Sequence, residues 1–411
     1  MALARKSIKQ RFHPSAQLLS VMECFRQMTN DCIRAGLQFE KENDRTPSLK
    51  KLSLLSYAEL RRRYGGYSQY ALCAISKAAS ILSTRKKSMR RGFPTGAPYV
   101  SKRGLVSCYG FKVEGGFLTV HLDGEAFESI PLNAHTRALL SDSTLRVSSF
   151  TLTEESVSLC VSKEVREMGA EEVAGVVGVD RNLRNLTVGD KRQVVIYDMT
   201  DVVGIGERTR EVVSSFKRDD VRIRRQIASK YGRRRSERTR QLLNLVSKKI
   251  VRDAKVSKRA IVFEEITGIR KLYGKGNGQG RSFRARMNSW PFYEIKRQIQ
   301  YKASWEGVPV ITLTGGETRG TTMDCPRCGE RLQVPIRGDV HHHRQLWCEK
   351  CGRWTDRDVV AVLNISRRGR LRFDRSQRKE GEAGEAVKGN AGRDGEPLIL
   401  RVDASKLRHG Q

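Results

Sequence analysis

The chain has 411 residues, enough for two or three domains that each bury a core. Its formal net charge is +33, from 78 Lys and Arg against 45 Asp and Glu, so the free protein would repel itself strongly. All of its apolar runs are far shorter than the roughly 20 residues that span a bilayer. These properties favour an anionic partner such as nucleic acid and argue against a membrane protein.

The cysteines and the N-terminus indicate the compartment. The first residues lack the apolar stretch and cleavage signature of a signal peptide. Four of the nine cysteines form two Cys-x-x-Cys pairs, and the other five stand singly among apolar neighbours. This pattern is typical of a reducing compartment with one metal site and not of a disulfide framework. We therefore expect a cytoplasmic protein.

The first half of the chain predicts helices placed between strands. A weak alternation over 7–12 indicates a strand, and apolar residues at helical spacing follow from Pro14 onward. A second helical region ends in a basic run at 85–91. Short alternating strands then occupy about 105–161, beginning with two that flank a Glu-Gly-Gly turn at 114–116. This half therefore predicts a helical bundle inserted into a small β-barrel or sheet.

The second half, from Gly175 to about Arg370, predicts an α/β domain. Apolar runs at 174–179, 260–263 and 308–313 have the length and β-branched content of buried strands. A hairpin is expected between the first two of these runs, around a Gly-Asp turn.

The helices of this half are strongly basic. Two long basic helices are expected on either side of the segment 230–235, and a further helix begins near Pro291 and ends at Gly307. From Phe373 onward the chain is rich in Gly, Glu, Lys and Arg, with few large apolar residues. A mostly disordered tail is therefore expected there.

A zinc site is predicted by two Cys-x-x-Cys pairs separated by 19 residues, namely Cys325, Cys328, Cys348 and Cys351. Each pair places two thiolates on one side of a metal, and two such knuckles complete a tetrahedral site. Gly329 and Gly352 follow the pairs, as a tight turn with positive φ requires. The histidines at 341–343 could compete as ligands, but four cysteines already suffice, so we interpret them as an exposed loop. A closed site of this kind is structural or contacts nucleic acid.

Three acidic residues stand where apolar runs begin or end. Asp180 closes the run Val-Val-Gly-Val, Glu264 closes Ala-Ile-Val-Phe, and Asp358 opens an apolar helix seven residues after the last cysteine. Buried carboxylates are costly unless a cation balances them. Three of them could hold two Mg²⁺ ions about 3.5–4 Å apart, one to prepare a water nucleophile and one to stabilise the leaving oxygen of a phosphodiester. Each acid alone would more simply cap a strand or pair with an arginine.

The order of these motifs resembles a known family. The stretch Gly-Val-Asp180-Arg-Asn-Leu-Arg-Asn-Leu-Thr and the stretch Ile-Val-Phe-Glu264-Glu-Ile look like its first and second RuvC motifs. The cysteine pairs, followed by Asp356-Arg-Asp358-Val-Val-Ala-Val-Leu-Asn-Ile, resemble its zinc ribbon and third motif. The family is TnpB, transposon-encoded RNA-guided nucleases related to compact type V CRISPR effectors. The resemblance covers about 173–370, and the first half matches more loosely.

What the resemblance implies is a multidomain α+β fold. A helical bundle would be inserted in a β-barrel-like N-terminal region, followed by an RNase H-like (RuvC) α/β nuclease domain with an inserted zinc ribbon. The implied boundaries are 1–14 and 95–170 for a β-rich wedge-like domain, 15–94 for a helical recognition domain, 171–319 and 353–372 for the RuvC-like domain, 320–352 for the zinc ribbon and 373–411 for the tail.

The resemblance also implies the activity, RNA-guided cleavage of DNA. Asp180, Glu264 and Asp358 take the positions of the catalytic acids and would bind Mg²⁺ or Mn²⁺, with Zn²⁺ in the ribbon. A guide RNA and target double-stranded DNA would be the partners, base pairing would supply most of the specificity, and a short DNA motif beside the target would also be read. It further implies a prokaryotic protein that is associated with the nucleoid when active.

The third acid has a rival, because Asp356 lies two residues before Asp358. We prefer Asp358, since the family's acid stands two residues before an Asn-Ala-Ala segment. The chain departs from that segment, with Val360 in place of the Asn and Val362 in place of the second Ala. Asn182 also stands where a Gly often follows the first motif. These changes affect fine geometry and leave the proposed ligands in place.

A dense cationic strip lies between the first two acids. Its predicted nucleic-acid contacts are Arg222, Arg224, Arg225, Lys230, Arg233, Arg234, Arg235 and Arg238. Binding through such a strip would weaken steeply with salt, because each neutralised phosphate releases counterions. The simpler interpretation is a solvated helix face. A Gly-rich basic loop at 271–281 could contact the guide, gate the site or merely connect two elements, and it lacks the ending of an ATP-binding loop.

Three alternatives to guided cleavage by a TnpB-like nuclease stay open. A compact type V CRISPR effector would use the same chemistry with a CRISPR-derived guide. A guided DNA-binding repressor would have lost cleavage, although relatives of that kind are expected to lose at least one of the acids. A transposase or junction resolvase without RNA would purify without a defined RNA.

Overall fold

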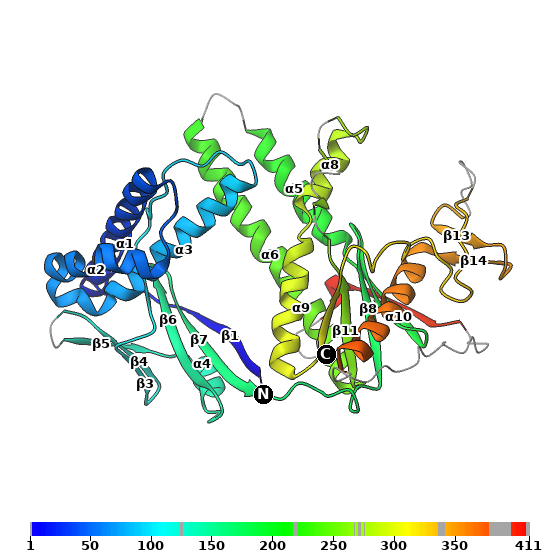
Figure 1. Ribbon diagram of the computed structural model, residues 1–411, viewed down its shortest axis with the longest axis horizontal. Helices are drawn as coiled ribbons and strands as arrows, with labels where there is room; N and C mark the ends of the chain where they lie inside the picture. The colour runs from blue at the N-terminus through cyan, green and yellow to red at the C-terminus, as the bar shows by residue number, and fades with distance from the viewer. Residues whose placement is uncertain are drawn as a thin grey trace. The chain divides into compact units, whose positions relative to one another are not determined.

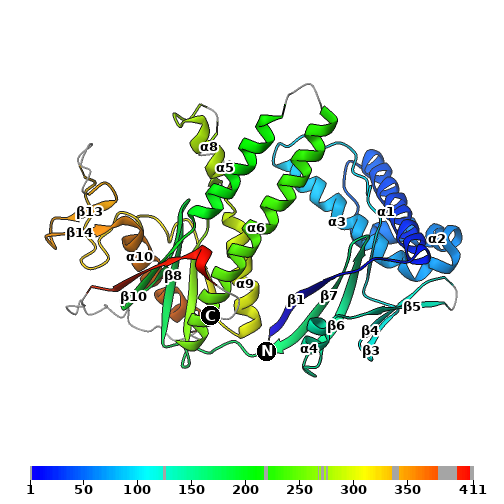
Figure 2. The same cartoon turned by 180° about the vertical axis from the view of Figure 1, so that it is seen from behind.

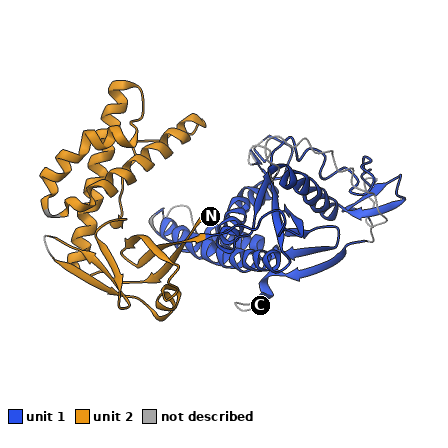
Figure 3. Ribbon diagram, turned by 60° about the horizontal axis from the view of Figure 1, so that its bottom comes forward, with its two compact units in different colours: residues 1–2, 165–411 blue, residues 3–164 orange. Residues whose placement is uncertain are grey.

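The computed structural model divides the chain into two compact units, Leu3–Glu164 and Val165–Gln411 with Met1–Ala2 (Figure 3). The structure describes residues 2–123, 126–216, 221–266, 268–269, 273–274, 276–335, 342–377 and 396–407. Each unit buries a hydrophobic core of its own. Within these ranges, no helix has both the length and the hydropathy needed to cross a membrane.

The N-terminal unit contains the predicted helices between strands. They are α1 (Ala16–Asn43), α2 (Leu49–Tyr64), η1 (Gly65–Tyr70), α3 (Ala71–Arg90) and the short α4 (Ala134–Leu140). The side chain of Ser15 starts α1 by accepting a hydrogen bond from the backbone N–H of Leu18 at 3.1 Å. The apolar positions that predicted this helix, among them Met22, Phe25 and Met28, are fully buried in the core of the unit.

The strands of this unit form two sheets. The first has the order β1-β7-β6-β2, from Ala2–Arg11, Ser156–Val165, Arg146–Thr153 and Gly104–Ser107. The second has the order β3-β4-β5, from Phe111–Glu114, Phe117–His121 and Phe127–Pro131. The turn between β3 and β4 is made by Gly115 and Gly116, both with positive φ. Closure of these strands into a barrel stays a prediction.

The C-terminal unit is built on a mixed six-stranded sheet of order β12-β11-β8-β9-β10-β15 (Figure 1). Its strands are β8 (Gly175–Arg181), β9 (Asn185–Gly189), β10 (Gln193–Asp198), β11 (Arg259–Glu264), β12 (Val310–Leu313) and β15 (Leu398–Asp403). β8, β11 and β12 are parallel, whereas β9 is antiparallel to both of its neighbours. The three buried strands and the hairpin predicted for this half are present.

Helices cover both faces of this sheet. They are α6 (Val221–Val256) and α9 (Phe292–Glu306) on one face and α10 (Arg357–Gln377) on the other. α5 (Thr200–Ser215) packs on α6, and α8 (Arg281–Ser289) packs on α5. Val177 and Val179 point to the face that α6 and α9 cover, and Val176 points to the opposite face, against Ile365 of α10. This alternation follows from the two-residue period of a strand. It explains why β8 has no polar residue before Asp180.

One sequence expectation for this unit was wrong, and a second is contradicted only at 373–377 and 396–407. The basic region forms one continuous helix, α6, through Gly232, where two helices were predicted. An added Cβ at Gly232 would meet no atom within 4 Å, so the residue sits on an open helix surface without breaking the helix. Glycine inside a helix costs only about 1 kcal/mol relative to alanine, which the packing of the last turns of α6 on the sheet offsets.

The second correction concerns the tail predicted to be disordered from Phe373. α10 continues to Gln377, and β15 pairs in parallel with β10, beside which it lies in Figure 2. Val402 and Leu407 pack against the core, and Ala404 is buried in it. The charged residues before the strand dominate the composition and conceal its short apolar run. Residues 378–395 lie outside the described part of the chain.

α10 packs very closely on β8. A Cβ added at Gly178 would lie 2.4 Å from the backbone oxygen of Val362 and 2.9 Å from the backbone nitrogen of Ser366. The hydroxyl of Ser366 donates a hydrogen bond to the backbone oxygen of Val176 at 2.7 Å. The second and third turns of α10 are thereby held against the first half of β8, which directs the first turn of the helix toward the carboxyl end of the strand.

We expect Gly178→Ala to destabilise the protein by about 1–3 kcal/mol, because the new methyl group must push α10 away from β8. The free energy of unfolding, measured by urea denaturation, checks this. Gly175→Ala is the matched control in the same strand, since its nearest atom would lie at 3.8 Å. Equal stability of the two variants would contradict the close approach.

Candidate active site

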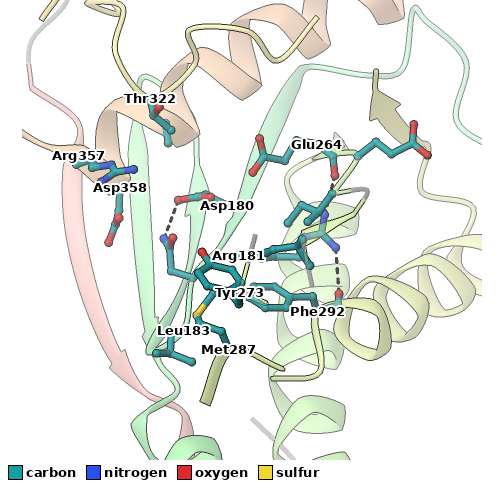
Figure 4. Close-up of a pocket in the computed structure, with 15 residues that line it drawn as sticks. Asp180, Arg181, Leu183, Glu264, Tyr273, Met287, Phe292, Thr322, Arg357 and Asp358 are labelled. Carbon is teal, nitrogen blue, oxygen red and sulfur yellow. Dashed lines mark hydrogen bonds between the residues drawn. The ribbon is translucent and has the colours of Figure 1, made fainter. Parts of the chain in front are cut away.

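A cavity of about 370 Å³ opens at the carboxyl ends of β8 and β11 (Figure 4). All three predicted acids line it: Asp180 from β8, Glu264 from β11 and Asp358 from the first turn of α10. Apolar side chains form much of the remaining wall, among them Leu183, Ile266, Met287 and Phe292.

The register of the sheet explains why the first two acids meet. Val262 of β11 pairs with Gly178 of β8, so Glu264 follows the same register toward Asp180. Both acids lie an even number of residues after side chains that face α10, and therefore project toward that helix. α10 in turn begins one residue before Asp358. Residues far apart in the sequence are thus brought together by strand pairing and by one helix contact.

The electrostatics of the cavity are unfavourable for the isolated protein. Burial and the nearby carboxylates of Glu264 and Asp358 raise the pKa of Asp180 to about 7, against the lowering effect of the Asn182 amide. Burial also raises the pKa of Glu264, while the charge of Arg181 lowers it. Asp180 and Asp358 are only 7% and 6% exposed. Desolvated like charges of this kind need a compensating cation.

Arg181 supplies only part of that charge. It donates hydrogen bonds to the backbone oxygens of Glu264 at 2.6 Å and Phe292 at 3.0 Å, and so serves the backbone at the cavity wall (Figure 4). Its guanidinium carbon lies 5.5 Å from the centre of the Phe263 ring. No ion pair of Asp180 or Glu264 with a basic side chain occurs in the described residues.

The structure separates the two candidates for the third acid. Asp358 lines the cavity and accepts hydrogen bonds from Asn185 at 2.8 Å and from Arg344. Asp356 instead accepts from the backbone N–H groups of Asp358 at 2.8 Å and Val359 at 3.4 Å, and caps α10. This arrangement favours Asp358 as the cavity acid.

The residues of the cavity fit divalent cations. Carboxylate oxygens are the ligands that Mg²⁺ and Mn²⁺ prefer, and the raised pKa of Asp180 signals a shortage of positive charge. Across the described ranges, only the four cysteines bring three or more ligand atoms within 4.8 Å of one another. The three acids are spread more widely than the four cysteines, and their carboxylate oxygens are the groups that would hold Mg²⁺ or Mn²⁺ in the cavity.

The four predicted cysteines do converge on one point. Their sulfur atoms all lie within 4.8 Å of one another, with Cys325 and Cys351 at 3.9 Å and Cys328 and Cys348 at 3.5 Å. Gly329 and Gly352 have φ of 80° and 60°, as the knuckle interpretation predicted. The group fits a tetrahedral zinc ion closed by four thiolates.

This cluster is anchored to α10. Val360 is fully buried in an apolar cluster with Cys325, Cys348 and two leucines. Asn364, one turn further along, donates hydrogen bonds to the backbone oxygens of Thr321 at 2.9 Å and Asp324 at 2.7 Å. The hairpin of β13 (Gln345–Cys348) and β14 (Arg353–Asp356) leads directly into the helix. The helix that presents Asp358 therefore also supports the ribbon.

The cationic strip lies on α6. Arg225, Lys230, Arg233, Arg234 and Arg238 are exposed, whereas Arg224 and Arg235 are half-buried. Among the described residues, none of these seven forms an ion pair with a carboxylate. The side chain of Arg222 lies outside the described residues. Spacings of four residues bring Lys230, Arg234 and Arg238 onto one face of the helix, where their charges are available to a ligand.

Arg235 differs from the rest of the strip. It donates a hydrogen bond to the backbone oxygen of Ser289 at 3.3 Å, and burial lowers its pKa. It therefore helps to hold α6 to α8.

Several polar residues around the acids were not predicted from the sequence. Asn185 and Arg344, which contact Asp358, were not singled out, and Asn182 was noted only as a departure from the family pattern. The asparagines stand inside the first motif, within five residues of Asp180, and that proximity was the available signal. Of the Gly-rich loop, Tyr273 lines the cavity, while 270–272 and 275 lie outside the described residues.

The raised pKa of Asp180 predicts how stability depends on pH in the absence of divalent ions. An acid with a folded pKa of about 7 and an unfolded pKa near 4 contributes stability below about pH 4, which is lost as the pH rises through 7. We therefore expect Asp180→Asn to be more stable than the wild type at pH 8 in EDTA, by a few kcal/mol at most. The gain should shrink toward pH 4–5, as urea denaturation at both pH values would show.

Asp190→Asn is the control for this prediction. Asp190 is also buried, but it pairs with Arg259 at 3.1 Å. Its replacement should destabilise the protein at pH 8, because it leaves the arginine without its partner. An Asp180→Asn variant that loses stability at pH 8 as well would contradict the shortage of positive charge.

Zinc content gives a second test of the site. We expect about one zinc per chain by elemental analysis, and loss of it in Cys348→Ser with a lower melting temperature, because the ribbon packs on α10. Cys160→Ser, at a free cysteine in β7, should keep the metal. Equal zinc in the two variants would refute the four-cysteine site.

Comparisons with known proteins agree with this arrangement. A family model described as the Cas12f1-like TNB domain matches residues 292–365, which include all four cysteines and Asp358. A TnpB-like protein of Methanocaldococcus jannaschii is 32% identical over 139 residues, which are 34% of this chain and 46% of the relative. A putative transposase of the same organism is 40% identical over 65 residues, 15% of this chain and 57% of the relative. The chain thus matches about half the length of these curated relatives.

Two solved structures share the fold. The Cas12f1–sgRNA–target DNA complex matches with a TM-score of 0.57 and 13% identity, covering 86% of this chain and 83% of that one. The mini-RNA-guided endonuclease CRISPR-Cas phi3 matches with a TM-score of 0.50 and 9% identity, covering 90% and 92%. At these identities the likeness concerns the multidomain fold of mixed helices and strands. The resemblance predicted from the motifs is confirmed: the chain is similar to a TnpB-like protein over 139 residues, matches the Cas12f1-like TNB family model over 292–365 and shares its fold with Cas12f1 and CRISPR-Cas phi3.

Proposed function

We propose that the chain is an RNA-guided DNA endonuclease that cuts target DNA beside a short recognised motif by metal-activated phosphodiester hydrolysis. The observation that carries the proposal is the convergence of Asp180, Glu264 and Asp358 in one cavity. The structures that share the fold add support, since one is a complex with guide RNA and target DNA and the other is an RNA-guided endonuclease.

The C-terminal unit would be the nuclease. We assign an RNase H-like (RuvC) domain to 171–319 and 353–372, with the zinc ribbon at 320–352 inserted in it. The N-terminal unit would contain the β-rich wedge at 1–14 and 95–170 and the helical recognition domain at 15–94. The topology supports this assignment, because parallel strands place catalytic side chains at their carboxyl ends.

Within the cavity, the protein's own residues would hold and orient the reactants. Asp180, Glu264 and Asp358 would bind Mg²⁺ or Mn²⁺, which supply a Lewis acid and a water of lowered pKa. The apolar wall that includes Met287 and Phe292 excludes bulk water and strengthens the electrostatic interactions inside. Zinc in the ribbon would be structural, because a site closed by four thiolates leaves no open position.

The cationic strip of α6 would bind the backbone of the guide RNA or the heteroduplex. Its exposed side chains lack carboxylate partners among the described residues, so their charge is available for phosphates. Base pairing would then supply the sequence specificity, and the protein would bind the phosphates of the nucleic-acid backbone. The excess of 33 positive charges over the whole chain is consistent with a bound polyanion.

A compact type V CRISPR effector is the second candidate. The match to the Cas12f1-like TNB domain favours it specifically. Its chemistry would be the same and only the source of the guide would differ. A repressor without cleavage gains no support from the site, since all three acids line the cavity.

Plasmid cleavage tests the proposal. The protein is purified with its copurifying RNA, the RNA is sequenced, and a matching target is offered with Mg²⁺. Asp358→Asn should lower the cleavage rate by on the order of 10³-fold, because it removes a metal-binding carboxylate, and the cut should follow a changed guide. Asp180→Ala should also abolish cutting.

Asp356→Asn is the matched control for the cleavage experiment. Asparagine caps a helix about as well as aspartate, so this variant should keep both the fold and the activity. Guided binding by the wild type without any cutting would replace the proposal with a repressor. If cleavage is lost in Asp356→Asn but kept in Asp358→Asn, then Asp356 and not Asp358 is the third acid.

A further inference from the structure

Two asparagine side chains connect the carboxylates of Asp180 and Asp358. The amide nitrogen of Asn182 donates to Oδ2 of Asp180 at 2.7 Å and to the side-chain oxygen of Asn185 at 3.1 Å. The amide nitrogen of Asn185 donates to Oδ2 of Asp358 at 2.8 Å. We call this chain of three hydrogen bonds the amide bridge.

Only one orientation of the two amides satisfies the amide bridge. An ionised carboxylate can only accept hydrogen bonds, so each asparagine must turn its NH₂ group toward its aspartate. Asn182 then has its second N–H left for Asn185, and Asn185 has its oxygen left to accept it. The two side chains therefore fix each other, and each fixes one carboxylate.

The backbone holds the amide bridge in place. The N–H of Asn182 donates to the backbone oxygen of Asn185 at 3.0 Å, which closes the turn between β8 and β9. Directly beyond this turn, Arg181 pairs with Leu186 and Asp180 with Thr187. The asparagines thus stand on a short, paired connection and not on a free loop. Because both are half-buried, their hydrogen bonds are also partly shielded from water.

We propose that Asn182 and Asn185 are positioning residues that preorganise Asp180 and Asp358 for divalent cations. The inference rests on the proposed function. Oδ2 of each carboxylate is engaged in the amide bridge, and Oδ2 of Asp358 also accepts a hydrogen bond from Arg344, so Oδ1 of each is left for a cation. Hydrogen-bonding partners of metal ligands commonly change metal affinity by roughly 10- to 100-fold.

A metal titration tests the proposal without relying on catalysis. Zinc-loaded, full-length protein is titrated with Mn²⁺, and the midpoint of the thermal shift is measured at constant pH. We expect Asn182→Ala and Asn185→Ala each to raise the Mn²⁺ midpoint by about 10-fold. The double variant should raise it by much less than the product of the single effects, because either substitution already breaks the bridge.

Two further variants distinguish a failure of this proposal from a failure of the proposed function. Asn30→Ala removes an asparagine of the N-terminal unit that bonds the backbone of Val100, and should lower stability without moving the midpoint. Asp180→Ala should abolish the Mn²⁺ shift. If the wild type shows no shift that Asp180→Ala removes, the metal site of the proposed function fails. If that shift is present but the two single asparagine variants have the Mn²⁺ midpoint of the wild type, the positioning role is overturned. It is also overturned if the midpoint shift of the double variant equals the product of the two single shifts.

Discussion

The structure depends above all on the close packing of α10 on β8. Gly178 is the one position in the middle of β8 without a side chain, and the backbone of α10 occupies the space that a Cβ would need. A second glycine, Gly369, makes the same helix fit against Val262 of β11, where a Cβ would lie 2.4 Å from a methyl group. Because the helix approaches both strands this closely, its first turn reaches the strand ends and brings Asp358 to the cavity that Asp180 and Glu264 already line.

That convergence has an electrostatic cost which the fold itself does not remove. Folding buries Asp180 and Asp358 and brings Glu264 near them. The nearby Arg181 donates its hydrogen bonds to backbone oxygens and not to these carboxylates. A protein selected for stability alone would replace such a cluster by apolar residues, because desolvated like charges are destabilising without cations. Electrostatic destabilisation of buried carboxylates, as found here, is typical of sites that bind metal ions or catalyse reactions. The same cluster of buried carboxylates therefore accounts for the proposed metal-dependent chemistry and for the electrostatic destabilisation of the site when no cation is bound.

The sequence predicted the parts of this arrangement that have a local signal. Strand ends, the two knuckles and the positive φ of Gly329 and Gly352 follow from residue type and spacing, and the structure contains them. The continuity of α6 through Gly232 was missed, because a lone glycine weakens a helix by less than packing stabilises it. β15 was missed because its pairing with β10 joins residues some 200 positions apart. The contact of Asn185 with Asp358 is likewise long-range, whereas Arg344 reaches Asp358 from across the β13–β14 hairpin, whose pairing was not predicted from the sequence.

The departures from the family's third motif follow from the same helix. Val360 replaces an asparagine, and its side chain is buried against the zinc knuckles, so this turn of α10 is apolar where it supports the ribbon. Val362 faces β10, where it packs with Val194 and Ile196, and only its backbone oxygen meets Gly178. Neither substitution reaches the cavity, whereas Asn182 does, and there it donates one hydrogen bond to Asp180. α10 thus connects the ribbon, the sheet and the acids, and a change in the zinc knuckles would be transmitted to Asp358 through two turns of one helix.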